Sequence, residues 1–223
     1  MRVLGVDAWV KGWVGVELVD GAFAGAHTAE QLADLVSLED FDAVAVDIPM
    51  GLLDEGFRAA ESAARRVLGP RSSSVFSTPP RAVLEQHTHA AANAVSKQLT
   101  GQGLGAQSYA LRTRILEADN LYGVAGLPLH EVHPEVSFAM MGDHPPAASK
   151  KTWRGVHERM TRLLAVGIDV PGDIGDAAKA GADDVLDAAA AAWSANRIAT
   201  GRAQSLPDPP QVNGRGQPSA IWY

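Results

Sequence analysis

The first 19 residues place the strongest constraint on the fold of this chain. An apolar run reaches Asp7, a short turn follows, and a second run rich in β-branched residues and Trp continues to Val19. Apolar runs bounded by a turn indicate two antiparallel strands, with Asp7 at the carboxyl end of the first. The next pair, Asp20-Gly21, favours a type I′ turn into a third strand. The chain is therefore expected to begin as an antiparallel meander.

A second continuous apolar run, at residues 43–46, ends in Asp47 and is stopped by Pro49. Such a run indicates a strand buried on both faces. Because a helical segment connects this strand to the meander, we expect it to lie parallel to a strand already in the sheet. The order β-β-β-α-β, followed by a short strand at 129–133 among helices, predicts an α/β fold with a mixed five-stranded sheet.

Composition and charge restrict the classes of partner. The 223 residues suit one large α/β domain, and 26 acidic against 19 basic residues give a net charge of -7. Proteins that grip long nucleic acids non-specifically usually carry a basic excess, so this charge favours a small or short substrate, or a metal that neutralises acidic groups. The absence of cysteine excludes disulfides, thiolate zinc sites and a cysteine nucleophile. With no signal-like start and no long apolar span, we expect a soluble, cytoplasmic protein that does not enter a membrane.

Asp7 and Asp47 each close a buried strand and form the first candidate site. On neighbouring parallel strands, which lie about 4.8 Å apart, both carboxylates would project from the same end of the sheet. Two like charges this close raise the pKa of one of the pair. A shared divalent cation resolves the conflict, and oxygen ligands favour Mg²⁺ or Mn²⁺. The alternative is structural, with Asp47 capping the turn before Pro49 and Asp7 accepting from loop amides.

Three further carboxylates open the last predicted helix, at Asp183, Asp184 and Asp187. At about 100° per residue they fall within one arc of the helix. Acidic residues at a helix start also stabilise the helix dipole. They would therefore contribute to a site only if this helix begins over the paired aspartates.

The segment around the short strand at 129–133 supplies another acidic group. Glu131 and His133 alternate onto one face of this strand, and Glu135 lies in the first turn of the next helix. Dipole compensation accounts for Glu135. The sequence leaves open whether Glu131 is a metal ligand or a structural residue.

Basic residues form two groups that suit a phosphate. The irregular loop 71–81 is bracketed by arginines and offers hydroxyls and backbone amides, an inventory that binds phosphate well. Serine and arginine are also common in ordinary loops. Lys150, Lys151 and Arg154 form the second group. The residues predicted to bind substrate are Arg71, Ser73, Ser74, Arg81 and Lys151.

Five motifs, in order along the chain, resemble the DUF429 family, which is described as predicted nucleases of RNase H-like fold. They are Gly5-Val-Asp7 with Gly12-Trp13, the run Asp47-Ile-Pro-Met-Gly51, Arg71 to Phe76 with Pro80-Arg81, Glu131 to Phe138, and Asp183 to Ala188. The resemblance extends to about Thr200. It implies an RNase H-like domain over residues 1–201, in which the first and fourth strands are parallel neighbours, with a helical insertion at about 52–128. Residues 202–223, rich in Pro, Gly and Gln, would be a loosely held C-terminal tail.

The wider superfamily, which includes Holliday-junction resolvases, is similar to this chain in its acidic layout. The resemblance implies a nuclease that hydrolyses phosphodiester bonds with two metal ions, one activating water and the other stabilising the leaving oxygen. Asp7 would bind both Mg²⁺ or Mn²⁺ ions, and Asp47 and Asp187 would bind one each. Asp184 or Glu131 would complete the coordination shell of the metal ions.

Two other classes of function stay open. A phosphotransferase or ATPase similar to actin and the sugar kinases needs glycine-rich turns after its catalytic aspartate, where this chain has Ala8-Trp9-Val10. A non-catalytic protein that binds a nucleotide or a partner fits the net charge and the absence of a basic stripe. The insertion could serve as a lid, a homodimer surface or a clamp. Its arginine-bracketed loop favours contact with the substrate, a nucleic acid or nucleotide.

Overall fold

The chain forms two compact units in the computed structural model, which describes residues 1–223. The first unit comprises Met1–Ile48, Ala125–Gln204 and Trp222–Tyr223, and the second comprises Pro49–Val124 and Ser205–Ile221. None of the helices combines the length and the apolar character needed to cross a membrane.

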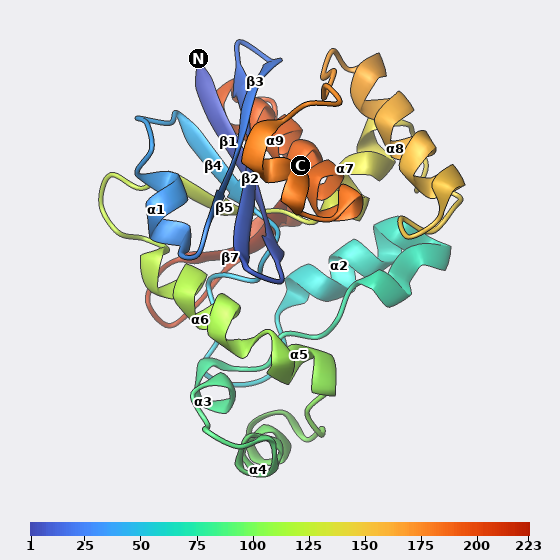
Figure 1. The fold of residues 1–223 in the computed structure, drawn as a ribbon. Coiled ribbons are helices and arrows are strands. Elements are labelled where there is room, and N and C mark those ends of the chain that lie inside the picture. The colour runs from blue at the N-terminus through green and yellow to red at the C-terminus, as the bar shows by residue number, and fades with distance from the viewer. The chain divides into compact units, whose positions relative to one another are not determined.

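A mixed five-stranded sheet forms the centre of the first unit, in the order β3-β2-β1-β4-β5 (Figure 1). Strands β1, β2 and β3 are antiparallel, whereas β4 is parallel to both β1 and β5. This arrangement confirms the predicted α/β class and the parallel pairing of the fourth strand. The strands are β1 (Arg2–Trp9), β2 (Gly12–Val19), β3 (Ala22–Ala29), β4 (Ala43–Val46) and β5 (Leu129–Glu131).

The first three strands form the meander that the turn residues predict. Asp20 and Gly21 have φ values of 51° and 86°. Positive φ at both central residues is the requirement of a type I′ turn, and β3 follows directly.

The register of β1 and β4 sets the two strand aspartates side by side. Val6 pairs with Val46, and the amide of Asp47 donates to the carbonyl of Val6 at 2.8 Å. Asp47 directly follows β4, as expected. Asp7 lies two residues before the end of β1, because β1 continues into the hairpin with β2.

Helix α9 covers one face of this sheet with a side made largely of alanine. Ala188 to Ala192 are all fully buried. A Cβ added at Gly5 would lie 1.9 Å from the Ala192 nitrogen and 2.2 Å from the Ala188 oxygen, so only glycine lets the helix backbone come this close to β1. The helices of this unit are α1 (Leu32–Val36), α7 (Pro134–Met141), α8 (Trp153–Ala165) and α9 (Ala182–Ala199), with the 3₁₀ helix η2 (Gly175–Lys179).

The second unit contains the helices of the predicted insertion and most of the C-terminal residues. Its helices are α2 (Ala59–Leu68), η1 (Gly69–Ser74), α3 (Arg81–Leu84), α4 (His89–Thr100), α5 (Ala106–Ala110) and α6 (Arg112–Leu121). The expectation of a loosely held tail is wrong, because these residues form the paired strands β6 (Ser205–Val212) and β7 (Pro218–Trp222). The Asn213 side chain fixes the turn between them, accepting from the amides of Arg215 and Gln217 at 2.9 Å each.

The close contact at Gly5 predicts that Gly5→Ala will destabilise the first unit. The added methyl group would meet helix backbone, which cannot move aside as a side chain can, so α9 must separate from β1. We expect the free energy of unfolding, measured with urea, to fall by about 2 kcal/mol or more. Gly172→Ala is the matched control, since no atom lies within 4 Å of a Cβ at Gly172. Equal stability of the two variants would contradict the expectation.

Candidate metal centre

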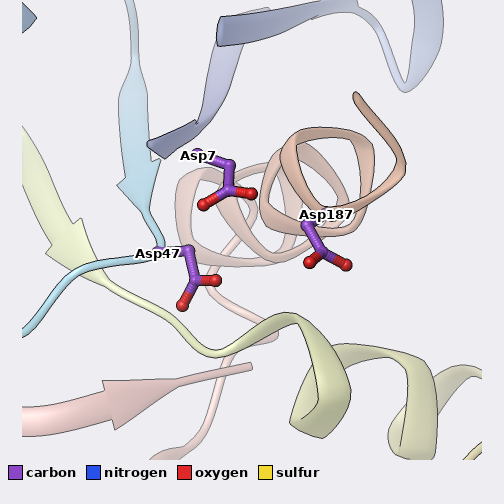
Figure 2. Close-up of side chains that lie close together, drawn as sticks. All are labelled: Asp7, Asp47 and Asp187. Carbon is purple, nitrogen blue, oxygen red and sulfur yellow. The ribbon is translucent and has the colours of Figure 1, made fainter. Parts of the chain in front are cut away.

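Three carboxylates meet at the carboxyl ends of β1 and β4. Asp7, Asp47 and Asp187 each offer an oxygen, and these atoms all lie within 4.8 Å of one another. Figure 2 shows that they come from three different elements: strand β1, the residue after β4 and helix α9. Asp7 and Asp187 are buried, and Asp47 is partly buried.

The packing of α9 on the sheet explains why Asp187 joins the strand aspartates. Ala188 lies against Gly5, and Asp187 is the residue before Ala188. Asp7 is two residues after Gly5, so it projects from the same face of β1. The chain therefore brings together residues 180 positions apart through one contact between backbones.

Burial and mutual repulsion make the three carboxylates reluctant to ionise together. Burial raises the pKa of Asp7 well above its usual value, and the charges of Asp47 and Asp187 raise it further. Burial also raises the pKa of Asp47 and that of Asp187 to about 7, although Lys150 opposes the shift in both. Such a cluster requires protons or cations to neutralise it.

The donor set fits a hard divalent cation. One oxygen of Asp187, Oδ1, is buried and has no hydrogen-bond partner, although buried polar atoms are nearly always paired. Carboxylate oxygens are the ligands that Mg²⁺ and Mn²⁺ prefer. A cation held by Asp7, Asp47 and Asp187 would satisfy this atom and relieve the repulsion among the three charges.

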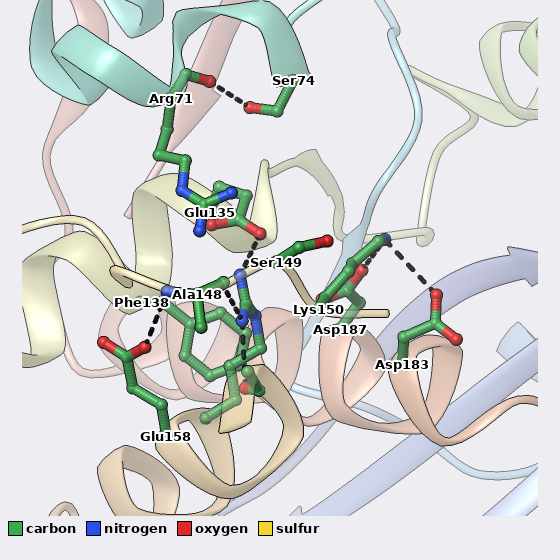
Figure 3. A network of polar contacts seen from close by, with 12 residues as sticks. Arg71, Ser74, Glu135, Phe138, Ala148, Ser149, Lys150, Glu158, Asp183 and Asp187 are labelled. Carbon is green, nitrogen blue, oxygen red and sulfur yellow. Dashed lines mark hydrogen bonds and ion pairs between the residues drawn. The ribbon is translucent and has the colours of Figure 1, made fainter. Parts of the chain in front are cut away.

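Two lysines approach the cluster from the segment before α8, and Figure 3 shows one of them, Lys150. The Lys150 ammonium forms an ion pair with Asp187 and lies 3.9 Å from Oδ2 of Asp183. Burial lowers the pKa of Lys150, but Asp187, and then Asp47 and Asp7, more than offset this and leave its pKa above the usual value. Lys151 pairs with Asp183 at 2.5 Å and keeps a largely exposed side chain.

Glu135, in the first turn of α7, is a fourth buried carboxylate close to the site. Its charge opposes ionisation of both Asp47 and Asp187. Arg159, which is completely buried, forms an ion pair with Glu135, and Figure 3 shows the network around this pair. The second oxygen of Glu135 has no hydrogen-bond partner.

The structure does not bring Glu131 into the cluster. Glu131 is buried and pairs in register with Val46, so its side chain projects from the opposite face of the sheet to that of Asp47. Asp184 is near the cluster and partly buried, and its charge helps to raise the pKa of Asp7. Its carboxylate is not one of the three that converge.

The residues predicted to bind substrate, apart from Lys151, belong to the second unit. Arg71, Ser73 and Ser74 lie in η1, where the Ser74 hydroxyl donates to the carbonyl of Arg71 at 2.8 Å. Arg81 begins α3 and forms an ion pair with the buried Asp119. Their assignment to substrate binding stays a prediction.

Sequence reasoning missed the roles of Lys150 and Glu135. Lys150 stood out only as one member of a basic group, and nothing in its spacing indicates an ion pair with Asp187. Glu135 was ascribed to the helix dipole. The signal that could have found it is its neighbour Pro134, which begins α7 three residues after the end of β5. Strand β5 pairs with β4, the strand that Asp47 follows.

Comparison with known proteins gives a family but no function. The sequence profile of a family described as "Protein of unknown function (DUF429)" matches residues 5–212. This match includes all the acidic residues of the cluster. None of the curated proteins compared with the chain matches it significantly.

The raised carboxylate pKa values predict that the metal-free protein loses stability as the pH rises. Folding raises the pKa of Asp47 from 3.8 to about 7, so the folded state binds more protons than the unfolded state in this interval. The stabilisation is present below about pH 4 and is lost as the pH rises through 7. Asp47→Asn removes the charge and keeps the shape, so we expect it to be more stable than the wild type at pH 8, by about 1 kcal/mol or more, and similar at pH 4.

Urea unfolding in the presence of a chelator measures this difference. Asp40→Asn is the control, because Asp40 is exposed and should follow the wild type at both pH values. An Asp47→Asn variant that is no more stable than the wild type at pH 8 would contradict the electrostatic account of the cluster.

Proposed function

We propose that the chain, which belongs to the DUF429 family, is a Mg²⁺- or Mn²⁺-dependent phosphodiesterase that hydrolyses nucleic acid. The observation that carries the proposal is the convergence of Asp7, Asp47 and Asp187 within 4.8 Å, with one buried oxygen of Asp187 lacking a partner. Three carboxylates held this close cost stability unless they serve to bind cations.

The sheet supports assignment to the RNase H-like fold. Its order is β3-β2-β1-β4-β5, with β1 and β4 parallel neighbours, as that fold requires. The acidic residues stand on the first strand, directly after the fourth strand and on a late helix, which is the layout that the nuclease resemblance implies.

The chain's own residues would hold and orient the reacting groups. Asp7 would share its carboxylate between two cations, while Asp47 and Asp187 would each bind one cation. Bound divalent cations supply water activation and neutralise the charge that develops on the phosphate. Burial of Asp7 and Asp187 keeps competing water away from their carboxylates.

The exposed rim of the site suits a phosphate-bearing substrate. The side chain of Lys151 is 70% exposed and stands beside Asp183 at the start of α9, where it could pair with a phosphate next to the cleaved bond. With a net charge of -7, the protein is better suited to a short or structured nucleic acid than to a long duplex held by many phosphate contacts.

A non-catalytic protein that binds a nucleotide or a partner is the second candidate. The observation that favours it is the ion pair between Lys150 and Asp187, because an ammonium already neutralises part of the acidic charge. In such a protein the cluster would be a structural ion-pair network, and divalent cations would have no effect on it.

Cleavage by an Asp7→Asn variant tests the proposal. The assay uses labelled single-stranded DNA, RNA and a branched DNA junction, each with Mg²⁺, with Mn²⁺ or with a chelator. We expect the wild type to cleave one of these substrates only with metal, and Asp7→Asn to be slower by at least about 100-fold, since loss of even an outer partner of a metal ligand costs about 10–100-fold.

Two comparisons complete this experiment. Asp40→Asn should keep full activity, and the circular dichroism of Asp7→Asn should match that of the wild type, so that a lost fold is not mistaken for a lost ligand. Cleavage by Asp7→Asn at the wild-type rate, or the absence of cleavage by the wild type on all three substrates, would refute the nuclease assignment.

A further inference from the structure

The Lys150 ammonium supplies a positive charge to the acidic cluster. Its ammonium pairs with Asp187, one of the three converging carboxylates. Attraction from Asp47 and Asp7 also acts on this ammonium. A lysine on a flexible surface segment could reach the cluster by chance, so the question is whether the fold holds Lys150 there.

Helix α8 fixes the segment that carries Lys150. The Glu158 carboxylate accepts from the amides of Ala147 and Ala148, at 2.9 and 3.1 Å. Arg159 donates to the carbonyl of Ala148 at 3.2 Å. These contacts hold the backbone immediately before Lys150 at two points.

Gly155 brings the same segment still closer to α8. A Cβ at Gly155 would lie 1.9 Å from the carbonyl oxygen of Ser149, so the helix tolerates no side chain at that position. Thr152 caps the start of α8, and its hydroxyl accepts from the amide of Gly155 at 3.1 Å. Lys150 therefore lies between two anchored backbone positions, so the fold holds its main chain within reach of Asp187.

An ammonium and a divalent cation cannot both lie close to Asp187 without repulsion. The three carboxylate oxygens lie within 4.8 Å of one another, so a metal among them would stand only a few ångströms from the ammonium. At about 4 Å, like charges near a protein surface repel by several times the thermal energy. The four-carbon stem of lysine allows the ammonium to move away while the anchored backbone stays in place.

We propose that Lys150 is an internal cation of the acidic cluster, which a divalent ion displaces from Asp187 when it binds. This inference rests on the metal site of the proposed function and does not require that the site be catalytic. Lys150 balances the charge of the metal-free protein and lowers its affinity for metal. Once displaced, its ammonium stands at the rim with Lys151, where it can pair with an anionic ligand.

Titration of Mn²⁺ into wild type, Lys150→Met and Lys151→Met by calorimetry tests the competition. Methionine keeps the unbranched stem and removes the charge. We expect Lys150→Met to bind Mn²⁺ at least about tenfold more tightly than the wild type. Lys151→Met is the matched control, because its ammonium pairs with Asp183, outside the three converging carboxylates, and its affinity should change less than about threefold. Equal or weaker binding by Lys150→Met would overturn the inference.

Lysine acylation distinguishes displacement from a purely electrostatic effect of the charge. An N-hydroxysuccinimide ester is applied to the wild type with and without Mn²⁺, and peptide mass spectrometry follows each lysine. We expect the acylation rate of Lys150 to rise at least about fivefold with Mn²⁺. Away from Asp187, the amine is no longer held in its charged, unreactive form by the carboxylate. The acylation rate of Lys151 should change little. An unchanged rate at Lys150 would show that metal binds without displacing it, which overturns the proposal.

The two measurements also separate this inference from the nuclease assignment. Tighter binding by Lys150→Met together with metal-induced acylation supports the displacement even if no nucleic acid is cleaved. If neither the wild type nor Lys150→Met binds Mn²⁺, both the metal site and the displacement are refuted.

Discussion

Contact between the backbones of β1 and α9 is the constraint on which the first unit depends. At Gly5 the strand has no side chain, and the backbone of α9 packs against it at Ala188 and Ala192, so the two elements are in contact through their main chains. The apolar residues of β1, β2 and β4 pack around this contact in one hydrophobic core. The same contact sets the position of Asp187 against Asp7, so the core and the acidic cluster are fixed together.

The cluster is costly because it places like charges in a buried setting. Burial and repulsion raise the pKa values of Asp7, Asp47 and Asp187, and Glu135 adds to the repulsion. Lys150 and Arg159 offset part of this cost through ion pairs with Asp187 and Glu135. A fold that needed only stability could replace such a network with apolar side chains. The proposed binding of cations would account for the network.

The parts of the structure that follow local rules could be predicted from the sequence. Apolar runs, turn residues and the rule for parallel connections gave the five strands and the parallel direction of the fourth. The placement of Asp7 beside Asp47 came from the family resemblance. The role of Asp187 could not be separated from dipole compensation by spacing alone, and it came from the family resemblance. Glu131 illustrates the limit of reading a short strand, since a shift of one residue in register moves a side chain to the other face of a sheet.

Long-range contacts account for the remaining differences. The Pro-rich residues of β6 carry the composition of a loose tail, but the Gln211 side chain accepts from the amide of Ala59, and Asn213 donates to the carbonyl of Leu52 at 3.3 Å. Neither partner is visible from local sequence. The ion pairs of Lys150 and Arg159 likewise join residues that are 24 or more positions apart.

The place of α9 in the chain has a consequence for folding. The four strands at the start of the chain are made long before the helix that covers them, since residues 49–124 intervene between the parts of the first unit. During synthesis the apolar face of these strands, which includes Val3, Val14 and Ala45, stays uncovered until α9 has been made. The chain grows at about 5–20 residues per second. A sheet left open in this way is exposed to aggregation. The same helix that completes the carboxylate cluster is thus the one that ends this vulnerable interval.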